Sequence, residues 1–403
     1  MCIKNDIQIS LSKGIPSALV LLDLSAAFDT IDHKILLRCL SDWFGLKGTV
    51  LDWFCSYLSG RSQQVKVGSA LSDPFKLTCG VPQGSVLGPI LFSMYTAPLS
   101  SVISAYGNTN HHFYADDTQL YIQLSPSNFI NAMAELQSCL LVVQDWMKAA
   151  KLKLNPDKTE FIVIGSDRQR ESLSEFFPVD ILGSSLSPTD KVRNLGVVFD
   201  SAFSFSNQIV SVCKSCFVGL RDLRRIKRYL SRSSAVILAK ALVSSKLDYC
   251  NSLYRSLTAR DLRRLQCVQN SLARIVTNTP RRSHITPVLK SLHWLPIKYR
   301  SIFKTSTIVY KFLKTGLPRY FSPYLSPYTS AVNTRRSDTN KMYLSKPTFQ
   351  PIKGASKSHF SKSFAYDAPD TWNDLPLDVR TAPSVSSFRS RLKAYLFSKA
   401  FPP

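Results

Sequence analysis

The apolar residues in the first half of the chain follow two periodicities, and each predicts a set of elements. The run at 17–23 carries Ala, Val and Leu without polar alternation, which predicts a strand covered on both faces. Residues 25–40 place apolar side chains at helical spacing and predict a helix. Two strands joined by a tight turn are predicted at 112–122. Helices are predicted after Pro89 and at 127–149, where an apolar stripe is expected to pack as core beneath the sheet.

The second half of the chain is mainly helical in its pattern. The helices predicted there span residues 207–229, 233–249 and 259–277. Beyond Pro318 the chain is rich in Pro, Ser and Tyr, which predicts a loosely folded connector. Order is expected to return at 364–397, which ends in a helix predicted at 384–397.

Charge is distributed unevenly along the 403 residues, which carry 51 Lys and Arg against 27 Asp and Glu. Residues 1–150 hold 9 basic and 11 acidic side chains, whereas residues 151–403 hold 42 and 16. The stretch 206–314 alone has 22 basic and 3 acidic residues. This asymmetry favours a polyanionic partner, above all nucleic acid. The alternative is a cationic solvated surface that keeps the protein soluble.

Composition excludes several other classes of protein. Hydrophobic content of 44% and aromatic content of 11% exclude a fully disordered chain. No apolar run approaches the roughly 18–20 residues of a membrane span, and no signal peptide is expected in the first twenty. Nine scattered cysteines indicate a reducing compartment, so a nuclear or cytoplasmic location is expected. Cys213 and Cys216 have CxxC spacing, but buried thiols are favoured over metal ligands.

Three carboxylates mark possible chemistry in the first half. Asp23 follows the first predicted strand, where it could simply cap the next helix. Asp116 and Asp117 lie in the predicted turn at 112–122, and aspartate commonly forms turns. Two adjacent carboxylates repel each other, however, and a turn needs only one. If the turn and the strand end meet on one sheet, the cluster requires divalent cations, with magnesium favoured, and indicates phosphoryl or nucleotidyl transfer.

A glycine- and proline-rich stretch lies between these acidic features. Residues 80–85 (GVPQGS) allow the backbone to approach a ligand closely, and Gln83 offers a donor and an acceptor. The alternative is a plain turn before a helix. No phosphate-binding loop of the Walker or Rossmann type is present.

Taken together and in this order, these segments resemble motifs A, B and C of reverse transcriptases, most closely those of non-LTR (LINE-like) retrotransposons. The matching segments are 20–29 (VLLDLSAAFD), 80–85 (GVPQGS) and 113–117 (FYADD). Residues 152–161 (LKLNPDKTEF) resemble motif D of the family, and 194–197 (NLGV) resemble its primer-grip region. The resemblance covers roughly residues 1–200.

The resemblance implies an α+β fold: a right-hand polymerase palm, with an antiparallel sheet packed on helices, followed by an α-helical thumb. Because only 22 residues precede Asp23, an N-terminally truncated chain with the fingers largely missing is expected. The implied domains are a palm at 1–165, a connection with the primer-grip-like region at 166–205, a basic thumb-like domain at 206–317, and a connector with a helical tail at 318–403.

The family's site residues carry over by position. Asp23 and Asp116 match the magnesium ligands, and Asp117 completes a cluster that would hold two Mg²⁺ ions. Lys158 matches the lysine proposed to protonate the leaving pyrophosphate, although a surface lysine after a turn is the alternative. Phe28 matches the residue that excludes a 2′-hydroxyl and so favours deoxynucleotides. The remaining substrate-binding positions are Gln83, Gly84 and Tyr114.

Basic side chains in the second half would hold the template–primer duplex through its phosphates, and this binding would be strongly salt-dependent. The residues expected to do so are Arg221, Arg224, Arg225, Lys227, Arg228, Arg263 and Arg264, with Arg260 beside them. The alternatives are a charged solvent-exposed face and a nuclear-import patch.

The resemblance implies an RNA-directed DNA polymerase that transfers deoxynucleotides (dNTPs) to a primer 3′-hydroxyl on an RNA template. A DNA primer or target would be the second nucleic-acid partner, and no membrane is involved. The main alternative is a catalytically inactive, nucleic-acid-binding remnant of a retroelement. An unrelated basic interaction protein is a third hypothesis.

Overall fold

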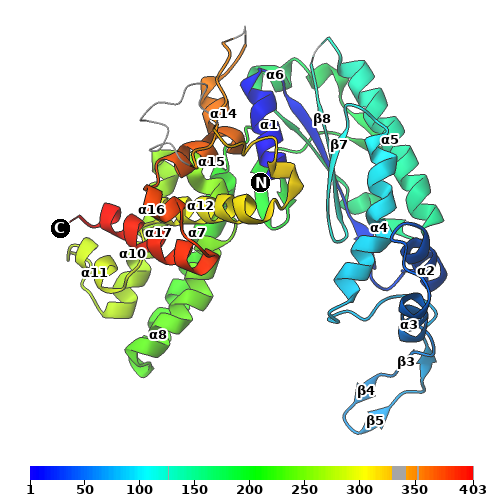
Figure 1. The fold of residues 1–403 in the computed structure, drawn as a ribbon, viewed down its shortest axis with the longest axis horizontal. Helices are drawn as coiled ribbons and strands as arrows, with labels where there is room; N and C mark the ends of the chain where they lie inside the picture. The colour runs from blue at the N-terminus through cyan, green and yellow to red at the C-terminus, as the bar shows by residue number, and fades with distance from the viewer. Residues whose placement is uncertain (126, 329–341, 352–353, 403) are drawn as a thin grey trace. The chain divides into compact units, whose positions relative to one another are not determined.

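The computed structural model describes residues 1–125, 127–328, 342–351 and 354–402. They form two compact units (Figure 1). The sheet unit comprises Pro16–Leu195, and the helical unit comprises Met1–Ile15 together with Gly196–Pro403. The N-terminal helix therefore belongs with the second half of the chain. The domain boundaries drawn from the sequence, and the expected lack of fingers, stay predictions.

A four-stranded antiparallel sheet forms the centre of the sheet unit, in the order β10-β1-β8-β7. The strands are β1 (Ser17–Leu22), β7 (Asn110–Tyr114), β8 (Asp117–Gln123) and β10 (Glu160–Ile164). β1 lies inside the sheet, between β10 and β8, and its residues Ala18, Leu19 and Val20 are fully buried. The prediction of a strand covered on both faces is confirmed, because a strand with two neighbours and two covered faces tolerates no polar alternation.

Helices α4 (Gly88–Ser104) and α5 (Phe129–Ala149) lie against one face of this sheet (Figure 1). The stripe predicted from the sequence of α5 is part of the core, and its members are Phe129, Met133, Leu136, Leu140, Val143 and Met147. The helix predicted after Pro89 is confirmed as α4, whose Phe92 and Leu99 are fully buried in the same core. Burying one such side chain contributes about 1.5–3 kcal/mol.

Short elements complete the sheet unit. Its remaining helices are α2 (His33–Asp42), α3 (Thr49–Leu58), η1 (Pro156–Lys158), α6 (Asp167–Glu171) and η2 (Ser174–Phe176). Its short strand pairs are β2 (Leu24–Ser25) with β9 (Lys153–Leu154), β3 (Ser62–Gln63) with β6 (Phe75–Lys76), β4 (Lys66–Val67) with β5 (Ala70–Leu71), and β11 (Val179–Ile181) with β12 (Ser184–Leu186). Strand β13 (Lys191–Asn194) precedes the end of the unit.

The helix predicted at 25–40 is wrong at its start, since α2 begins at His33. Ala26 has a φ of 52°, and the amides of the following turn bond back to its carbonyl. Asp32 caps α2 by accepting from the Ile35 amide at 3.0 Å. Ile31 lies in the loop before α2 and is nonetheless fully buried, so its apolar side chain mimics the spacing of a helix.

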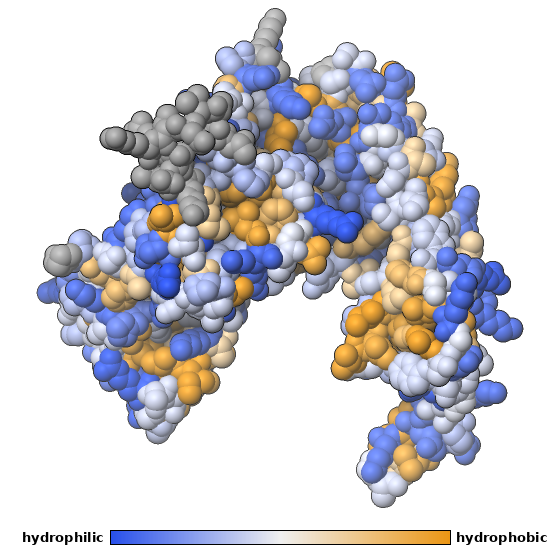
Figure 2. Space-filling model, in the orientation of Figure 1, coloured by the Kyte–Doolittle hydropathy of each residue, from blue (hydrophilic) through white to orange (hydrophobic). Residues whose placement is uncertain are grey.

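The protein also exposes an apolar surface around α2 and α3, part of which is seen as an orange area in Figure 2. Trp43, Phe44, Val50 and Trp53 are 41–56% exposed there. These side chains remove little apolar area from water, so the stability of the unit depends on the core between the sheet and α4–α5.

The helical unit contains the helices predicted from the second half of the chain. Its elements are α1 (Cys2–Ser12), β14 (Val197–Asp200), α7 (Ser206–Ile226), η3 (Lys227–Tyr229), α8 (Arg232–Ala239), η4 (Lys240–Ser244, a π-helix), α9 (Ser245–Asp248), η5 (Asn251–Ser256), α10 (Ala259–Thr277), α11 (Thr286–Ser291), α12 (Ile297–Thr315), η6 (Arg319–Phe321), α14 (Lys357–Lys362), α15 (Phe364–Asn373), α16 (Leu377–Arg380) and α17 (Val385–Ala400). Among the described residues, no helix combines the length and the apolar character needed to cross a membrane.

The segment beyond Pro318, expected to be a loose connector, contributes buried side chains to a core. Phe321, Leu325 and Leu344 are buried with Trp372 in one apolar cluster. Residues 329–341 and 352–353 of the segment lie outside the described residues. A few well-placed large side chains are sufficient to order a chain that is poor in apolar residues overall.

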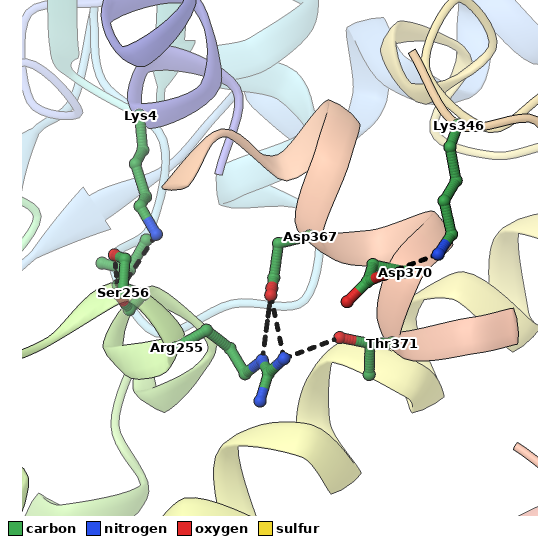
Figure 3. Close-up of polar contacts among 8 residues, drawn as sticks. Lys4, Arg255, Ser256, Lys346, Asp367, Asp370 and Thr371 are labelled. Carbon is green, nitrogen blue, oxygen red and sulfur yellow. Dashed lines mark hydrogen bonds and ion pairs between the residues drawn. The ribbon is translucent and has the colours of Figure 1, made fainter. Parts of the chain in front are cut away.

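Helix α1 joins the helical unit through buried polar side chains. Asn5 Oδ1 accepts from the Ala365 amide at 2.8 Å, and Lys4 Nζ donates to the Leu253 carbonyl at 3.2 Å. In Figure 3 the Lys4 side chain descends from α1 towards η5, near the pair formed by Arg255 and Asp367. Burial lowers the pKa of Lys4 to about 8, and the charge of Asp367 opposes this shift.

We expect Lys4→Met to stabilise the protein at neutral pH by about 1 kcal/mol, because it removes a buried charge at the cost of one hydrogen bond. The pKa of Lys4 is lower in the folded chain (about 8) than its ordinary 10.5. Between these two pKa values the unfolded chain therefore binds more protons than the folded chain, so the free energy of unfolding rises with pH in this range. Urea unfolding at several pH values should show this rise in the wild type and not in the variant. An equal rise in both would contradict the prediction.

Candidate active site

The three acidic residues expected to bind metal lie at one end of the four-stranded sheet. Leu22, the last residue of β1, pairs with Thr118 of β8. Because the two strands are antiparallel, the next position places Asp23 beside Asp117. Asp116 lies in the turn between β7 and β8. The predicted strand, turn and strand are thus confirmed, and they bring the carboxylates from two distant segments together.

The electrostatics of this cluster follow from its like charges. Burial raises the pKa of Asp117, and the charges of Asp116 and Asp23 raise it further. Asp23 is not a helix cap, since Asp32 caps α2. One oxygen of Asp23, Oδ2, lies 3.0 Å from Lys158 Nζ, yet it is buried and accepts no hydrogen bond from any described residue.

These observations fit a hard divalent cation, which binds carboxylate oxygens and neutralises their repulsion. Asp23 supplies a buried oxygen that has an ion-pair partner in Lys158 but accepts no hydrogen bond from a described residue, and Asp117 supplies a carboxylate whose charged form is disfavoured without a counter-charge. Within the described part of the chain, no choice of one oxygen from each of the three carboxylates brings all three oxygens within 4.8 Å of one another. Mutual repulsion favours this separation.

A cavity of about 410 Å³ opens beside Asp23 and Asp117. Its lining residues are Leu21, Leu22, Asp23, Asp117, Thr118, Gln119, Asp157, Lys158, Glu160, Arg193, Asn194 and Leu195. Asp116 does not line it. Asp157, Glu160 and Arg193 are not among the site residues expected from the sequence. Asp157 could have been found as the acidic neighbour of Lys158, whereas nothing in the local sequence marks Arg193.

Two loops meet beside the site through backbone hydrogen bonds. The Val81 amide donates to the Phe28 carbonyl at 2.9 Å, and the Gly80 amide donates to the Ile31 carbonyl at 2.8 Å. Gly80 has a φ of 85°, and a Cβ at this position would lie 2.9 Å from the Asp29 carbonyl oxygen, so a side chain there would separate the loops. The close approach accounts for this glycine.

The expected substrate-binding residues differ in their surroundings. The Phe28 ring packs on Phe92 of α4 with a centroid distance of 4.9 Å. Gln83 is exposed and donates from Nε2 to both carboxylate oxygens of Asp29, at 3.0 and 3.1 Å. Gly84 borders open space, and Tyr114 at the end of β7 is 66% exposed.

The helical unit gathers part of the expected basic cluster around a cavity of about 620 Å³. The cationic residues that line it are Arg224, Lys227, Arg228, Arg274 and Arg281, and no carboxylate of the described residues lines it. The sequence analysis missed the last two. Arg221, Arg225, Arg263 and Arg264 are not among its lining residues, and Arg264 instead forms an ion pair with Asp261 at 3.1 Å.

Comparison with known proteins supports an assignment of the first half. Residues 8–199 match the family described as reverse transcriptase (RNA-dependent DNA polymerase). The chain is 30% identical over 274 residues to the probable RNA-directed DNA polymerase from transposon BS of Drosophila melanogaster, covering 65% of this chain and 29% of that protein. It is 26% identical over 266 residues to the RNA-directed DNA polymerase from mobile element jockey of Drosophila funebris, covering 64% and 28%.

Among solved structures, apo telomerase from Candida tropicalis matches with a TM-score of 0.38 and 10% identity. The match covers 85% of this chain and 56% of that one. The matched part of the chain spans less than a third of the length of the transposon BS and jockey polymerases.

Proposed function

Residues 8–199 belong to the reverse transcriptase (RNA-dependent DNA polymerase) family, with relatives in non-LTR retrotransposons, and from this premise we propose that the chain is an RNA-directed DNA polymerase. The observation that carries the proposal is the cluster of Asp23, Asp116 and Asp117 at the end of adjacent strands, with Lys158 at ion-pair distance from Asp23. Structural acidic residues have no need to converge in this way, because their repulsion destabilises the fold.

In this proposal the sheet unit is the polymerase palm, and helices α7 to α10 form the thumb. An antiparallel sheet backed by α4 and α5 supplies a rigid support for the carboxylates. The cationic cavity lined by Arg224, Arg228 and Arg281 supplies the charge that a nucleic-acid backbone requires. An RNA template and a DNA primer are the proposed partners.

Polymerases of this family generally use divalent metal ions, and Asp23, Asp116 and Asp117 would hold them, as two Mg²⁺, through carboxylate oxygens. When bound, such ions activate a hydroxyl nucleophile and stabilise charge on the attacking and leaving oxygens. The chain's contribution is to hold the three carboxylates on adjacent strands despite their repulsion.

The proposed reaction joins the primer 3′-oxygen to the α-phosphorus of a dNTP, while the bond from that phosphorus to the pyrophosphate oxygen breaks. The proton of the primer hydroxyl passes to solvent water as the new bond forms. Lys158 Nζ, which lies beside Asp23 and is largely exposed to solvent, donates a proton to the leaving pyrophosphate. Arg193, from the same cavity lining, faces the same region as a fixed positive charge.

Phe28 is proposed to exclude the 2′-hydroxyl of a ribonucleotide. Its ring is braced by Phe92 and its carbonyl by the Val81 amide, so it cannot easily move aside. Gln83, on the loop bonded to that of Phe28, would contact the incoming nucleotide together with Gly84, while Tyr114 would contact it from the end of β7.

We expect Phe28→Val to lower the preference for dNTPs over ribonucleotides by about 10–200-fold, the discrimination that steric fit around a single small group supplies in a pocket. Single-nucleotide extension with matched dNTP and ribonucleotide concentrations measures the ratio. The control is Phe92→Leu, which alters the packing behind Phe28 but keeps the Phe28 ring. It should change the ratio less. An unchanged ratio in Phe28→Val would contradict the gating role.

A catalytically inactive nucleic-acid-binding protein is the second candidate, favoured by the cationic cavity, whose lining residues include none of the site carboxylates. The deciding experiment is primer extension by the purified chain on an RNA template with dNTPs and magnesium. Extension supports the polymerase. Salt-sensitive binding without extension supports the second candidate and contradicts the first.

A further inference from the structure

A second cavity of about 560 Å³ lies within the helical unit, where the segment Lys240–Asp248 faces the helices α12 and α17. Its lining residues are Lys240, Ser244, Ser245, Asp248, Asn251, His293, Trp294, Leu295, Arg300, Phe303, Lys304, Arg389 and Lys393. None of these residues lines the cavity of Arg224, Arg228 and Arg281 or belongs to the expected duplex-binding set. Its volume lies in the range of small-ligand sites.

Positive charge dominates this cavity. Five cations line it against one carboxylate, Asp248, which is paired with Arg300. The other four cations are Lys240, Lys304, Arg389 and Lys393, and none has a carboxylate partner among the described residues. Like charges gathered in one hollow repel each other unless an anion joins them.

Flat rings stand beside these cations. Trp294 and His293 line the cavity, and the Arg389 guanidinium lies 5.9 Å from the centre of the Phe303 ring. His293 has a φ of 52° in the turn that follows α11, a conformation that glycine adopts at lower cost. A side chain is therefore kept on this wall at a conformational cost. Across from it, the π-helix η4 contributes Lys240 and Ser244, and such turns recur at functional sites.

We propose that this cavity binds a single strand of nucleic acid, with a backbone phosphate held by Lys304, Lys393 and Arg389 and an unpaired base placed against Trp294. An unpaired base can enter a cavity and stack on an aromatic ring, whereas the bases of a duplex are closed off by pairing. The hydroxyls of Ser244 and Ser245 can donate to phosphate oxygens. The inference rests on the proposed function only in that the chain handles nucleic acid.

The test measures binding of fluorescein-labelled oligo(U) to the full chain by anisotropy over a series of salt concentrations. The variant Lys304→Ala with Lys393→Ala should weaken binding. It should also reduce the slope of log K against log [salt] by about 0.7 for each lost phosphate contact. The control pair is Lys311→Ala with Lys314→Ala, on the same helix α12 as Lys304 but outside the cavity lining. It should leave the slope unchanged.

The stacking contact is tested separately. Trp294→Ala should lower affinity for oligo(U) by about 5–150-fold, the range for losing one stacked base, while Trp294→Phe should retain most of it. Thermal unfolding of each variant shows whether it folds. If Trp294→Ala does not fold, the variant Lys304→Ala with Lys393→Ala still tests the proposal. Equal slopes for the cavity and control pairs, or equal loss from Trp294→Phe and Trp294→Ala, would overturn the proposal.

Two further outcomes separate this proposal from others. If inorganic phosphate or a single dNTP displaces oligo(U) at concentrations close to the oligonucleotide's own dissociation constant, the cavity is a site for a small phosphorylated ligand and the single-strand proposal is wrong. Primer extension decides the polymerase independently. If the chain does not extend a primer but binds oligo(U) in a way that depends on Lys304 and Lys393, the proposed polymerase activity is wrong and the proposed single-strand site in the cavity is supported.

Discussion

Asp23→Asn abolishes primer extension in our proposal, with a loss of about a thousandfold or more. Neutralising this residue removes the carboxylate whose buried Oδ2 accepts no hydrogen bond from a described residue and lies 3.0 Å from Lys158 Nζ. A metal-held charge in the transition state is worth several kcal/mol, and each 1.36 kcal/mol is about tenfold in rate. Extension of a labelled primer by equal amounts of wild type and variant, over a series of magnesium concentrations, measures the loss.

Two comparisons show whether this loss is catalytic. Asp157→Asn removes a carboxylate that lines the same cavity but is not in the expected cluster, and it should change the rate only a few-fold. Without metal, Asp23→Asn should unfold at the same urea concentration as the wild type or a higher one, because the charge of Asp23 also raises the pKa of Asp117. Extension at the wild-type rate by Asp23→Asn would rule out this carboxylate as a metal ligand.

Asp367→Ala should destabilise the helical unit by about 3 kcal/mol, because removing one partner of a largely buried pair leaves an uncompensated charge. Arg255 donates to Asp367 at 3.1 and 3.3 Å and to Thr371 at 3.1 Å (Figure 3). The side chains of the pair are 19% and 18% exposed. Without Asp367, Arg255 and the buried Lys4 would repel each other with no anion between them.

The same helix α15 supplies a matched control. Asp370 pairs with Lys346 at 2.6 Å, but both side chains are more than 40% exposed. Asp370→Ala should therefore cost only about 0–1 kcal/mol. Urea unfolding of the two variants at neutral pH compares the pairs directly. Equal losses would mean that burial does not distinguish the two ion pairs and would contradict the prediction.

Elements with a strong local pattern were predictable. The uninterrupted run before Asp23 became an inner strand, and the stripe of α5 became core, because in both cases periodicity and burial have the same cause. The helix predicted at 25–40 failed over its first turns. Phe28 and Ile31 are apolar because they close a loop over α4, and spacing alone does not distinguish such a loop from a helix.

The candidate site was partly predictable for a similar reason. Asp23, Asp116 and Asp117 stand next to patterned strands, so their position at the strand ends followed from the sequence. Arg193 lies on a short strand with no distinctive neighbours, and its place beside the cluster depends on how the chain returns to the sheet. The same holds for Arg274 and Arg281, which join Arg224 across a cavity.

The sequence by itself determined the inner strand before Asp23, the helices with a strong apolar pattern, the acidic turn of the first half and the excess of positive charge in the second, since each depends on near neighbours in the chain. Only the tertiary structure decided that helix α1 belongs to the unit of residues 196–403, that Lys4 is buried there, and which cations share a cavity. These depend on contacts between residues far apart in the chain, such as Lys4 and Leu253. Such contacts form where the burial of apolar surface exceeds the entropy of ordering the chain, a balance that no local pattern records.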